Sequence, residues 1–247
     1  MSIQAYDADM VEAPGAETLA AGAVANLWAS FGRLWPLWSV LTLLYAIAAA
    51  AAEGLSGFSQ LPILIGADFA AALVAGIAIR VLLGRGLAAW KPDGGLAAFV
   101  VIAGLAAVGP TALMLFAQPP AHAPSQAEVS SFTTQAGGAG VIGAAFLWAA
   151  MRLSPWPIGL LLGNAEMTAG RSWRLMRGVV LRFAMAAILL SAPLIALAVM
   201  VGMLTKPQGH LISQLAITPV SSLVALLAAA VAVEVYRSRI AVAPEPD

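Results

Sequence analysis

The stretch from 152 to 178 concentrates arginine in a chain that is otherwise 61% hydrophobic and only 10% charged. Arginine can bind phosphate and carboxylate groups, and tryptophan places its ring at a membrane surface. On a helical wheel of about 100° per residue drawn over 171–182, one half holds Arg171, Arg174, Arg177 and Arg182. The other half holds Trp173, Leu175, Met176, Val179 and Val180. The candidate lipid-binding or partner-binding residues are Arg152, Trp156, Arg171, Trp173, Arg174, Arg177 and Arg182.

The same arginines have a simpler explanation in membrane topology, which we prefer. If the chain crosses a membrane six times, eleven of its twelve Lys and Arg residues fall on the side of the termini, and Lys206 falls on the other. Cytoplasmic loops carry an excess of Lys and Arg. We therefore expect a multi-pass protein of the bacterial inner membrane with both termini in the cytoplasm. Its basic face would suit anionic lipid headgroups or other membrane protein subunits, and the zero formal net charge suggests no nucleic-acid partner.

Asp68 is an ionisable residue inside an apolar run, where an isolated charge is costly. It lies seven residues into the run that starts at Leu61, which places it about 10 Å deep. Asp68 could be a proton or substrate site of a transporter, or it could cap a helix that begins at Phe69. The sequence favours the cap. Arg80, further along the run, is expected to reach the cytoplasmic interface by snorkelling.

The chain offers few residues for catalysis. It has no cysteine, and its two histidines, His122 and His210, stand in no metal-ligand spacing and beside no carboxylate cluster. No glycine loop ends in the Gly-Lys-Ser/Thr sequence that binds phosphate. We therefore assign no catalytic, cofactor-binding or metal-ligating residue and expect a non-enzymatic protein without a cofactor.

The elements that hold these side chains are predicted to be membrane helices. Soluble domains are about 45–50% apolar and about 25% charged, so this composition predicts an all-α polytopic membrane protein with about six transmembrane helices and amphipathic interfacial helices. Residues 18–35 favour an interfacial helix that runs up to Pro36. Pro110, Pro193 and Pro219 favour kinks. The expected spans are 37–52, 61–83, 96–117, 137–153, 179–204 and 211–235.

One membrane domain is expected to occupy most of the chain. Residues 1–17 are acidic and polar and predict a flexible tail, residues 18–240 form the six-span domain, and residues 241–247 form a short C-terminal tail. Residues 118–136 are rich in Pro, Ser, Thr and Gln, which predicts a solvated loop between the third and fourth spans. The glycines of QAGGAG and the Gly159–Gly163 pair are expected to let helices approach closely.

The segment MRLSPWPIGLLLGNAEMTAGRSWRLMRG, with ANLWASFGRLWPLWSVL near the N-terminus, resembles the bacterial membrane domain named after glycerophosphoryl diester phosphodiesterases. The matching residues are Arg152, Pro155, Ser172, Trp173, Leu175, Arg177 and Gly178. The resemblance implies a six-span helical inner-membrane module of mostly unassigned activity. In some members it accompanies a soluble phosphodiesterase domain. This chain has no room for that domain and lacks its carboxylate and histidine cluster, so the enzymatic name is not transferred.

Two functions follow from these observations. The preferred hypothesis is a non-enzymatic membrane protein that organises lipid or serves as an accessory subunit of a membrane complex, with its basic amphipathic face toward lipid or a partner. The alternative is a small transporter or channel in which Asp68 and the proline-kinked helices line a path. An intramembrane enzyme would need polar residues that converge at one depth, and the sequence reveals no such set.

Overall fold

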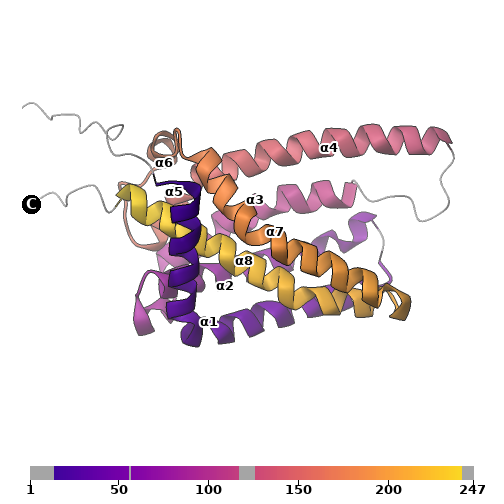
Figure 1. The fold of residues 1–247 in the computed structure, drawn as a ribbon, viewed down its shortest axis with the longest axis horizontal. Helices are drawn as coiled ribbons and strands as arrows, with labels where there is room; N and C mark the ends of the chain where they lie inside the picture. Colours follow the sequence, from indigo (N-terminus) through magenta and orange to yellow (C-terminus); the bar gives the residue numbers. More distant parts are fainter. Residues whose placement is uncertain (1–13, 56, 117–125, 241–247) are drawn as a thin grey trace, which may run out of the picture.

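The computed structural model describes residues 14–55, 57–116 and 126–240, and every regular element in this part of the chain is a helix (Figure 1). The predicted all-α architecture is confirmed. The helices are α1 (Ala16–Ala52), α2 (Leu61–Leu82), α3 (Gly94–Phe116), α4 (Gln126–Leu153), α5 (Pro155–Leu161), α6 (Ala169–Leu175), α7 (Val180–Thr205) and α8 (His210–Ile240). The short 3-10 turns are η2 (Gly57–Gln60), η3 (Gly86–Trp90) and η4 (Lys206–Gln208).

Five of these helices, α1, α2, α3, α7 and α8, are long and apolar enough to cross a membrane. The end of α4 and the whole of α5 pass the same test together, with a bend of 45° between them, so the structure has up to six spans. The chain is therefore an integral membrane protein. Each predicted span lies within one of these helices or extends past it by a single residue. Long apolar runs of this kind suit helices that cross the hydrocarbon of a membrane. The expected tails, 1–17 and 241–247, lie almost wholly outside the described residues, and α1 already begins at Ala16.

Helix α1 bends near its middle, where Pro36 lies. Figure 1 shows its first half running across the long axis of the molecule and its second half following that axis, as the other long helices do. Pro36 has no backbone N–H, and its ring disfavours a straight helix. The first half therefore has the orientation of a helix that lies along a membrane surface, as residues 18–35 predict.

The apolar residues of this first half form two faces. Leu19, Ala23 and Leu34 are buried against the bundle. A second apolar row stays exposed, at a spacing of three and four residues that keeps it on one side of the helix. Its members are Val24, Trp28, Phe31 and Trp35. The first half of α1 thus packs one apolar face against the protein and exposes a second apolar face on the outside of the bundle.

The break between α4 and α5 comes from the sequence Ser154-Pro155. A proline inside a helix cannot donate to the carbonyl four residues earlier, which here belongs to Met151. The hydroxyl of Ser154 donates to that carbonyl oxygen at 3.0 Å. The chain can therefore turn at this point without leaving the Met151 oxygen unpaired.

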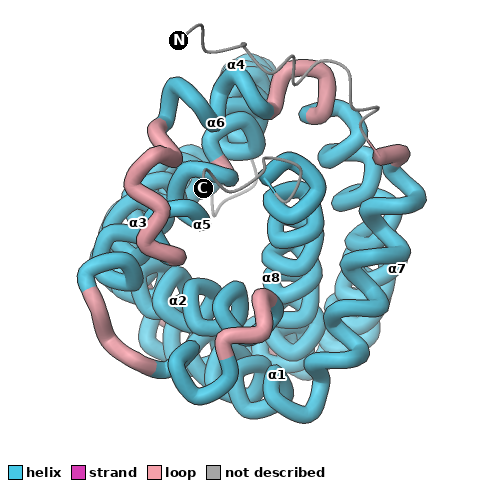
Figure 2. The backbone as a smooth tube through the Cα atoms, turned by 90° about the vertical axis from the view of Figure 1, so that its left-hand side faces the viewer, coloured by secondary structure: helices cyan, strands magenta, loops and turns pink. Residues whose placement is uncertain are grey.

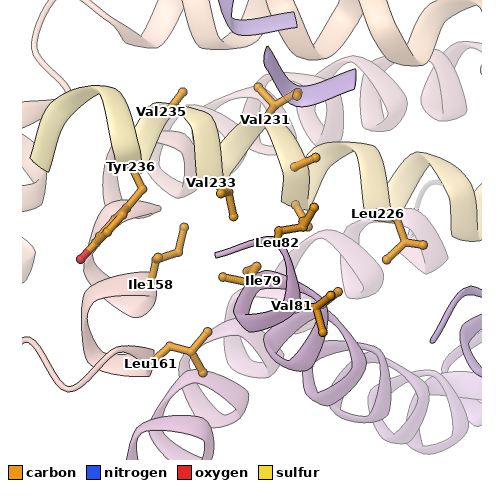
Figure 3. Packing of buried hydrophobic residues seen from close by; sticks show 14 of the residues in the cluster. Ile79, Val81, Leu82, Ile158, Leu161, Leu226, Val231, Val233, Val235 and Tyr236 are labelled. Atoms are coloured by element: carbon orange, nitrogen blue, oxygen red, sulfur yellow. The ribbon is translucent and has the colours of Figure 1, made fainter. Parts of the chain in front are cut away.

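The helices pack tightly at one end of the bundle. The buried cluster draws mainly on the second halves of α2 and α8, the first halves of α1, α3 and α7, and on α5. Figure 3 shows its members from α2, α5 and α8. Val231, Val233 and Val235 are fully buried, so most of the circumference of α8 is covered by other helices here. Figure 2 views the molecule from this end and shows α8 beside α1 and α7, the two helices with which it makes its most extensive contacts. We call it the arginine end, after Arg80, Arg85, Arg152 and Arg237.

Helix α4 differs from its prediction at its start and in its packing. It begins at Gln126, so the expected loop 118–136 is wrong from that residue onward. Residues 126–136 mix good helix formers (two alanines, two glutamines and a glutamate) with serines and threonines, and they continue the apolar helix toward its N-terminus. The glycines of QAGGAG do not bring helices together, because a side chain at Gly137, Gly138 or Gly140 would meet open space.

The Gly159–Gly163 pair was expected to let helices approach closely, and the structure gives it another role. Gly159 lies directly against the side chain of Met167, within its own connection rather than against another span. Gly163 adopts a left-handed conformation, with φ of 79°, and ends the turn after α5. The two glycines therefore shape the chain after α5.

Candidate functional site

Asp68 lies inside α2 rather than at its start. The helix begins at Leu61, so the expectation that Asp68 caps a helix beginning at Phe69 is wrong. Pro62 stands in the first turn, where its missing N–H costs nothing, and this lets the helix start one residue before it. Thr111 of α3 donates a hydrogen bond of 2.7 Å to Asp68 Oδ2. Asp68 is half-buried and turned toward the interior of the bundle.

Asp68 and Thr111 line a cavity of about 740 Å³ between α1, α2, α3 and α8. The cavity lies in the half of the bundle opposite the arginine end, where few side chains are buried. Its apolar wall consists of alanine, leucine and isoleucine side chains. Its polar lining residues are Tyr45, Glu53, Gln60, Asp68, Thr111, Gln214, Thr218 and Ser221. A set of polar residues from four helices thus converges where the sequence alone reveals none.

The cavity carries negative charge. Asp68 and Glu53 are its two carboxylates, with Glu53 exposed at the end of α1. Among the lining residues that the structure describes, none is Lys, Arg or His. Low-dielectric walls strengthen the field of a carboxylate, so this cavity favours cations over anions.

The segment of α8 around Pro219 borders the cavity and is held by α1. Pro219 deprives the Leu215 carbonyl of its helical partner, and Thr218 Oγ1 donates to that oxygen at 2.8 Å. Trp38 Nε1 of α1 donates to the Pro219 oxygen at 3.0 Å. One turn further along α1, the hydroxyls of Thr42 and Ser222 lie 2.6 Å apart. Trp38 therefore holds the Pro219 segment of α8 against α1.

At the arginine end, Arg80 is buried and does not snorkel to the surface as expected. Only 2% of the residue is exposed. Its guanidinium group donates to Asp93 Oδ1, to the Lys91 oxygen at 2.8 Å and to the Leu161 oxygen at 3.2 Å. A buried charge is tolerated where it is paired and hydrogen-bonded. Arg80 thus joins α2 to the start of α3 and to the end of α5.

Asp93 has a second role at the start of α3. It accepts a hydrogen bond of 2.8 Å from the backbone N–H of Leu96, as a helix-capping aspartate does. This backbone donor, followed by the guanidinium of Arg80, lowers the pKa of Asp93 below its usual range. Asp93 therefore stays ionised under physiological conditions and caps α3 while it pairs with Arg80.

Two further arginines bind helix ends nearby. Arg85 Nη2 donates to the Leu162 oxygen at 3.1 Å, and Arg237 Nη2 donates to the Leu82 oxygen at 2.7 Å. Carbonyl groups in the last turn of a helix lack helical partners and carry partial negative charge, so arginines are favourable there. Arg237 also pairs with Glu234 at 3.2 Å, and Asn26 of α1 donates to the same carboxylate at 3.1 Å. Together these contacts hold the helix ends against one another at the arginine end.

The predicted candidates around residue 170 do not lie on one helix. Helix α6 ends at Leu175, and α7 begins at Val180. Gly178 between them has a φ of 79°, which breaks the helical register that a wheel over 171–182 assumes. Met176 is fully buried, whereas Trp173 is exposed, so these two residues do not share a face.

The predicted arginines also differ in their surroundings. Arg171 forms an exposed ion pair of 3.0 Å with Glu166. Arg174 and Arg177 are exposed, and Arg182 and Trp156 are half-buried. The guanidinium carbon of Arg152 lies 4.6 Å from the ring centre of Trp148 and 4.7 Å from that of Trp173. Two of the predicted candidates, Arg152 and Trp173, are therefore in contact, and Trp148, which was not among the candidates, contacts Arg152 as well. Of the two histidines, His122 lies outside the described residues, and the side chain of His210 does too.

Comparison of the chain with protein-family models, with curated proteins and with solved structures finds no match in any of the three. The resemblance to the glycerophosphoryl diester phosphodiesterase membrane domain therefore stays an expectation from the quoted residues. The chain is an integral membrane protein with an acidic cavity at one end of its helix bundle. At the other end it has a tightly packed core with several arginine contacts.

Proposed function

We propose that this integral membrane protein is a small transporter that binds a cationic solute in the cavity around Asp68. The observation that supports the proposal best is the cavity itself. It unites two carboxylates and several neutral polar side chains from four helices, in a chain where only 10% of residues are charged. Ionisable residues inside membrane helices commonly mark the pathway of an ion or solute.

The size and chemistry of the cavity suit a small organic cation. Small-molecule sites typically enclose about 300–1,000 Å³, and this cavity holds about 740 Å³. Asp68 supplies the charge that attracts an ammonium group, and Thr111 holds the carboxylate in place. Tyr45, Gln214 and Thr218 supply hydroxyl and amide groups that can bind polar parts of the solute.

The packing asymmetry supports a transport cycle. The described conformation has its cavity in one half of the bundle and a tightly packed core in the other, with Arg80, Asp93 and the end of α5 in contact. A transporter exposes its site to one side of the membrane at a time. With the arginine end in the cytoplasm of a bacterial inner membrane, this conformation would face outward. Pro219 lies near the middle of α8, where its missing backbone N–H weakens the helix, and this position would serve as the hinge.

Uptake into proteoliposomes tests this function. The probes are radiolabelled methylammonium, tetramethylammonium and choline, supplied outside vesicles that hold an inside-negative diffusion potential. We expect uptake of at least one of them above that of protein-free vesicles. Asp68→Asn should reduce that uptake at least about tenfold, since removing the charge that pairs with a buried cation costs more than about 1.4 kcal/mol.

The matched control is Glu166→Gln, which removes an exposed carboxylate at the arginine end. It should leave uptake unchanged, and both variants should show the wild-type melting profile and helix content. Uptake of none of the three cations by well-folded protein, or equal uptake by Asp68→Asn and wild type, contradicts the proposal.

An accessory subunit of a membrane complex is the second candidate, and the packing of α4 favours it. Residues such as Val141, Phe146 and Leu147 are exposed on this helix, and side chains at Gly137 and Gly140 would meet open space. Small residues on membrane helices permit close association with another helix. This non-enzymatic role predicts that a partner co-purifies in mild detergent and is lost on Gly140→Leu. Purification of a partner-free chain would count against it.

A further inference from the structure

Arg152 is enclosed by two tryptophan rings at the end of α4. Its guanidinium carbon lies 4.6 Å from the ring centre of Trp148, one helical turn earlier, and 4.7 Å from that of Trp173 on α6. The two rings stand edge to face with their centres 5.3 Å apart. Arginine stacks on tryptophan faces through cation–π attraction, which fixes the plane of the guanidinium group. Its N–H donors at the edge are left for another partner.

This arrangement is anchored by the fold. Ser172 Oγ donates to the Arg152 carbonyl oxygen at 2.9 Å, and Ser172 is fully buried. Thr168 caps α6 by accepting from the backbone N–H of Arg171. The end of α4 and the start of α6 are therefore held together, and Trp173 is presented to Arg152 by a fixed backbone.

Arg152 lacks the carboxylate that its neighbours have. Arg80 pairs with Asp93, Arg171 with Glu166, and Arg237 with Glu234. Within the described part of the chain, the Arg152 guanidinium has no hydrogen bond or ion pair, and its Nε is buried without a partner. A partly desolvated cation without a counter-charge is unfavourable unless an anion comes from outside the chain.

The position of Arg152 indicates what that anion is. The residue ends the apolar part of α4, whose sides are exposed, and the residues Trp148 and Trp173 are 47% and 37% exposed. Tryptophan at this depth marks the interface between hydrocarbon and headgroups. The anion available at a membrane interface is a lipid phosphate, which arginine binds through two N–H donors at once.

We propose that Arg152, Trp148 and Trp173 form a binding site for the headgroup phosphate of an anionic phospholipid. The acyl chains would lie along the exposed flank of α4. Arg174 and Arg177, exposed on the adjoining segment, add positive potential that favours a lipid with net negative charge over a zwitterionic one. This site lies at the arginine end and is separate from the cavity at Asp68.

Native mass spectrometry with a defined lipid mixture tests the site. Purified wild-type protein is equilibrated in detergent with equal amounts of phosphatidylglycerol and phosphatidylcholine of identical acyl chains. We expect wild type to retain phosphatidylglycerol preferentially and Arg152→Gln to lose most of that preference, by about tenfold, the usual consequence of removing a charged donor. Arg171→Gln is the matched control, because Arg171 already pairs with Glu166. It should keep the preference.

Two further measurements remove ambiguity. Phosphatidylglycerol should raise the melting temperature of wild-type protein more than phosphatidylcholine does, and this needs no variant. Soluble glycerol phosphate, which carries the headgroup without acyl chains, should not displace the lipid at equal concentration, since the site is lipidic. Equal retention of the two lipids by wild type, or equal losses in Arg152→Gln and Arg171→Gln, would overturn the proposal. Neither outcome bears on cation uptake at Asp68.

Discussion

Thr111 of α3 donates a hydrogen bond of 2.7 Å to Asp68 of α2, and this pair joins two membrane helices at the wall of the cavity. A carboxylate in a partly apolar site needs such a donor to stay in one orientation. The pair therefore connects the stability of the α2–α3 contact with the binding chemistry proposed for Asp68.

Thr111→Val should weaken both properties. The substitution keeps the shape of the side chain but removes the donor, and leaving the Asp68 oxygen without its partner costs about 1–3 kcal/mol. We expect a lower melting temperature and weaker cation uptake, both measured on purified protein. Thr111→Ser keeps the hydroxyl and should stay close to wild type. Equal behaviour of the valine and serine variants would show that the hydrogen bond has no such role.

Filling the cavity should block binding without changing any charge. Ala49 lines the cavity, whereas its neighbour Ala50 is exposed on the outside of α1. We expect Ala49→Phe to reduce cation uptake at least about tenfold, because the ring would occupy the space beside Asp68. Ala50→Phe places the same ring on the outer surface and should have little effect. Uptake that is reduced equally in both variants would argue against the cavity as the solute site.

Acid should weaken the contacts made by Asp93. Because the Leu96 N–H and Arg80 lower the pKa of this residue in the folded protein, its carboxylate contributes stability above the unfolded pKa of about 3.9. That contribution is lost as the pH falls through the lowered folded value. The side chain is 44% exposed, so we expect only about 1 kcal/mol.

Melting temperatures measured from about pH 7 to about pH 3 check this expectation. Asp93→Asn should be less stable than wild type at neutral pH, and the difference should shrink toward the acidic end. Glu166→Gln, which alters an exposed ion pair, should follow wild type throughout. A difference between Asp93→Asn and wild type that is constant over the whole range would contradict the assignment.

Two glycines should respond in opposite ways to alanine. A Cβ at Gly95 would lie 2.6 Å from the Leu160 oxygen, whereas one at Gly140 in α4 would meet open space. We expect Gly95→Ala to cost about 1–3 kcal/mol, since the end of α5 must move. Gly140→Ala should be neutral or stabilising by up to about 1 kcal/mol. Chemical or thermal unfolding of both variants distinguishes them, and a harmless Gly95→Ala would mean that α5 is not held against α3.

The spans could be predicted because each contains a long, predominantly apolar run. The start of α4 could not, because residues 126–136 have the composition of a loop and become helical only as an extension of the apolar segment. The helical wheel over 171–182 was wrong because the left-handed conformation of Gly178 interrupts the helix. Residues before and after Gly178 therefore do not follow one helical repeat.

The cavity and the buried arginine depend on which helices are neighbours. Asp68, Thr111 and Thr218 stand at comparable depths in three spans. A comparison of the depths of polar residues across the spans could have predicted that they line one cavity. The partners of Arg80 are two residues of the next connection, Lys91 and Asp93, and the carbonyl end of α5, 81 residues away. Periodicity within one segment cannot reveal either relationship.

Equilibrium binding of the transported cation to purified protein tests the central claim most directly. Radiolabelled cation is titrated onto wild type, Asp68→Asn and Glu166→Gln in the same detergent, with folding of each checked by its melting profile. The account predicts saturable binding to wild type and to Glu166→Gln, and affinity at least about tenfold weaker for Asp68→Asn. Binding to Asp68→Asn with wild-type affinity would contradict it.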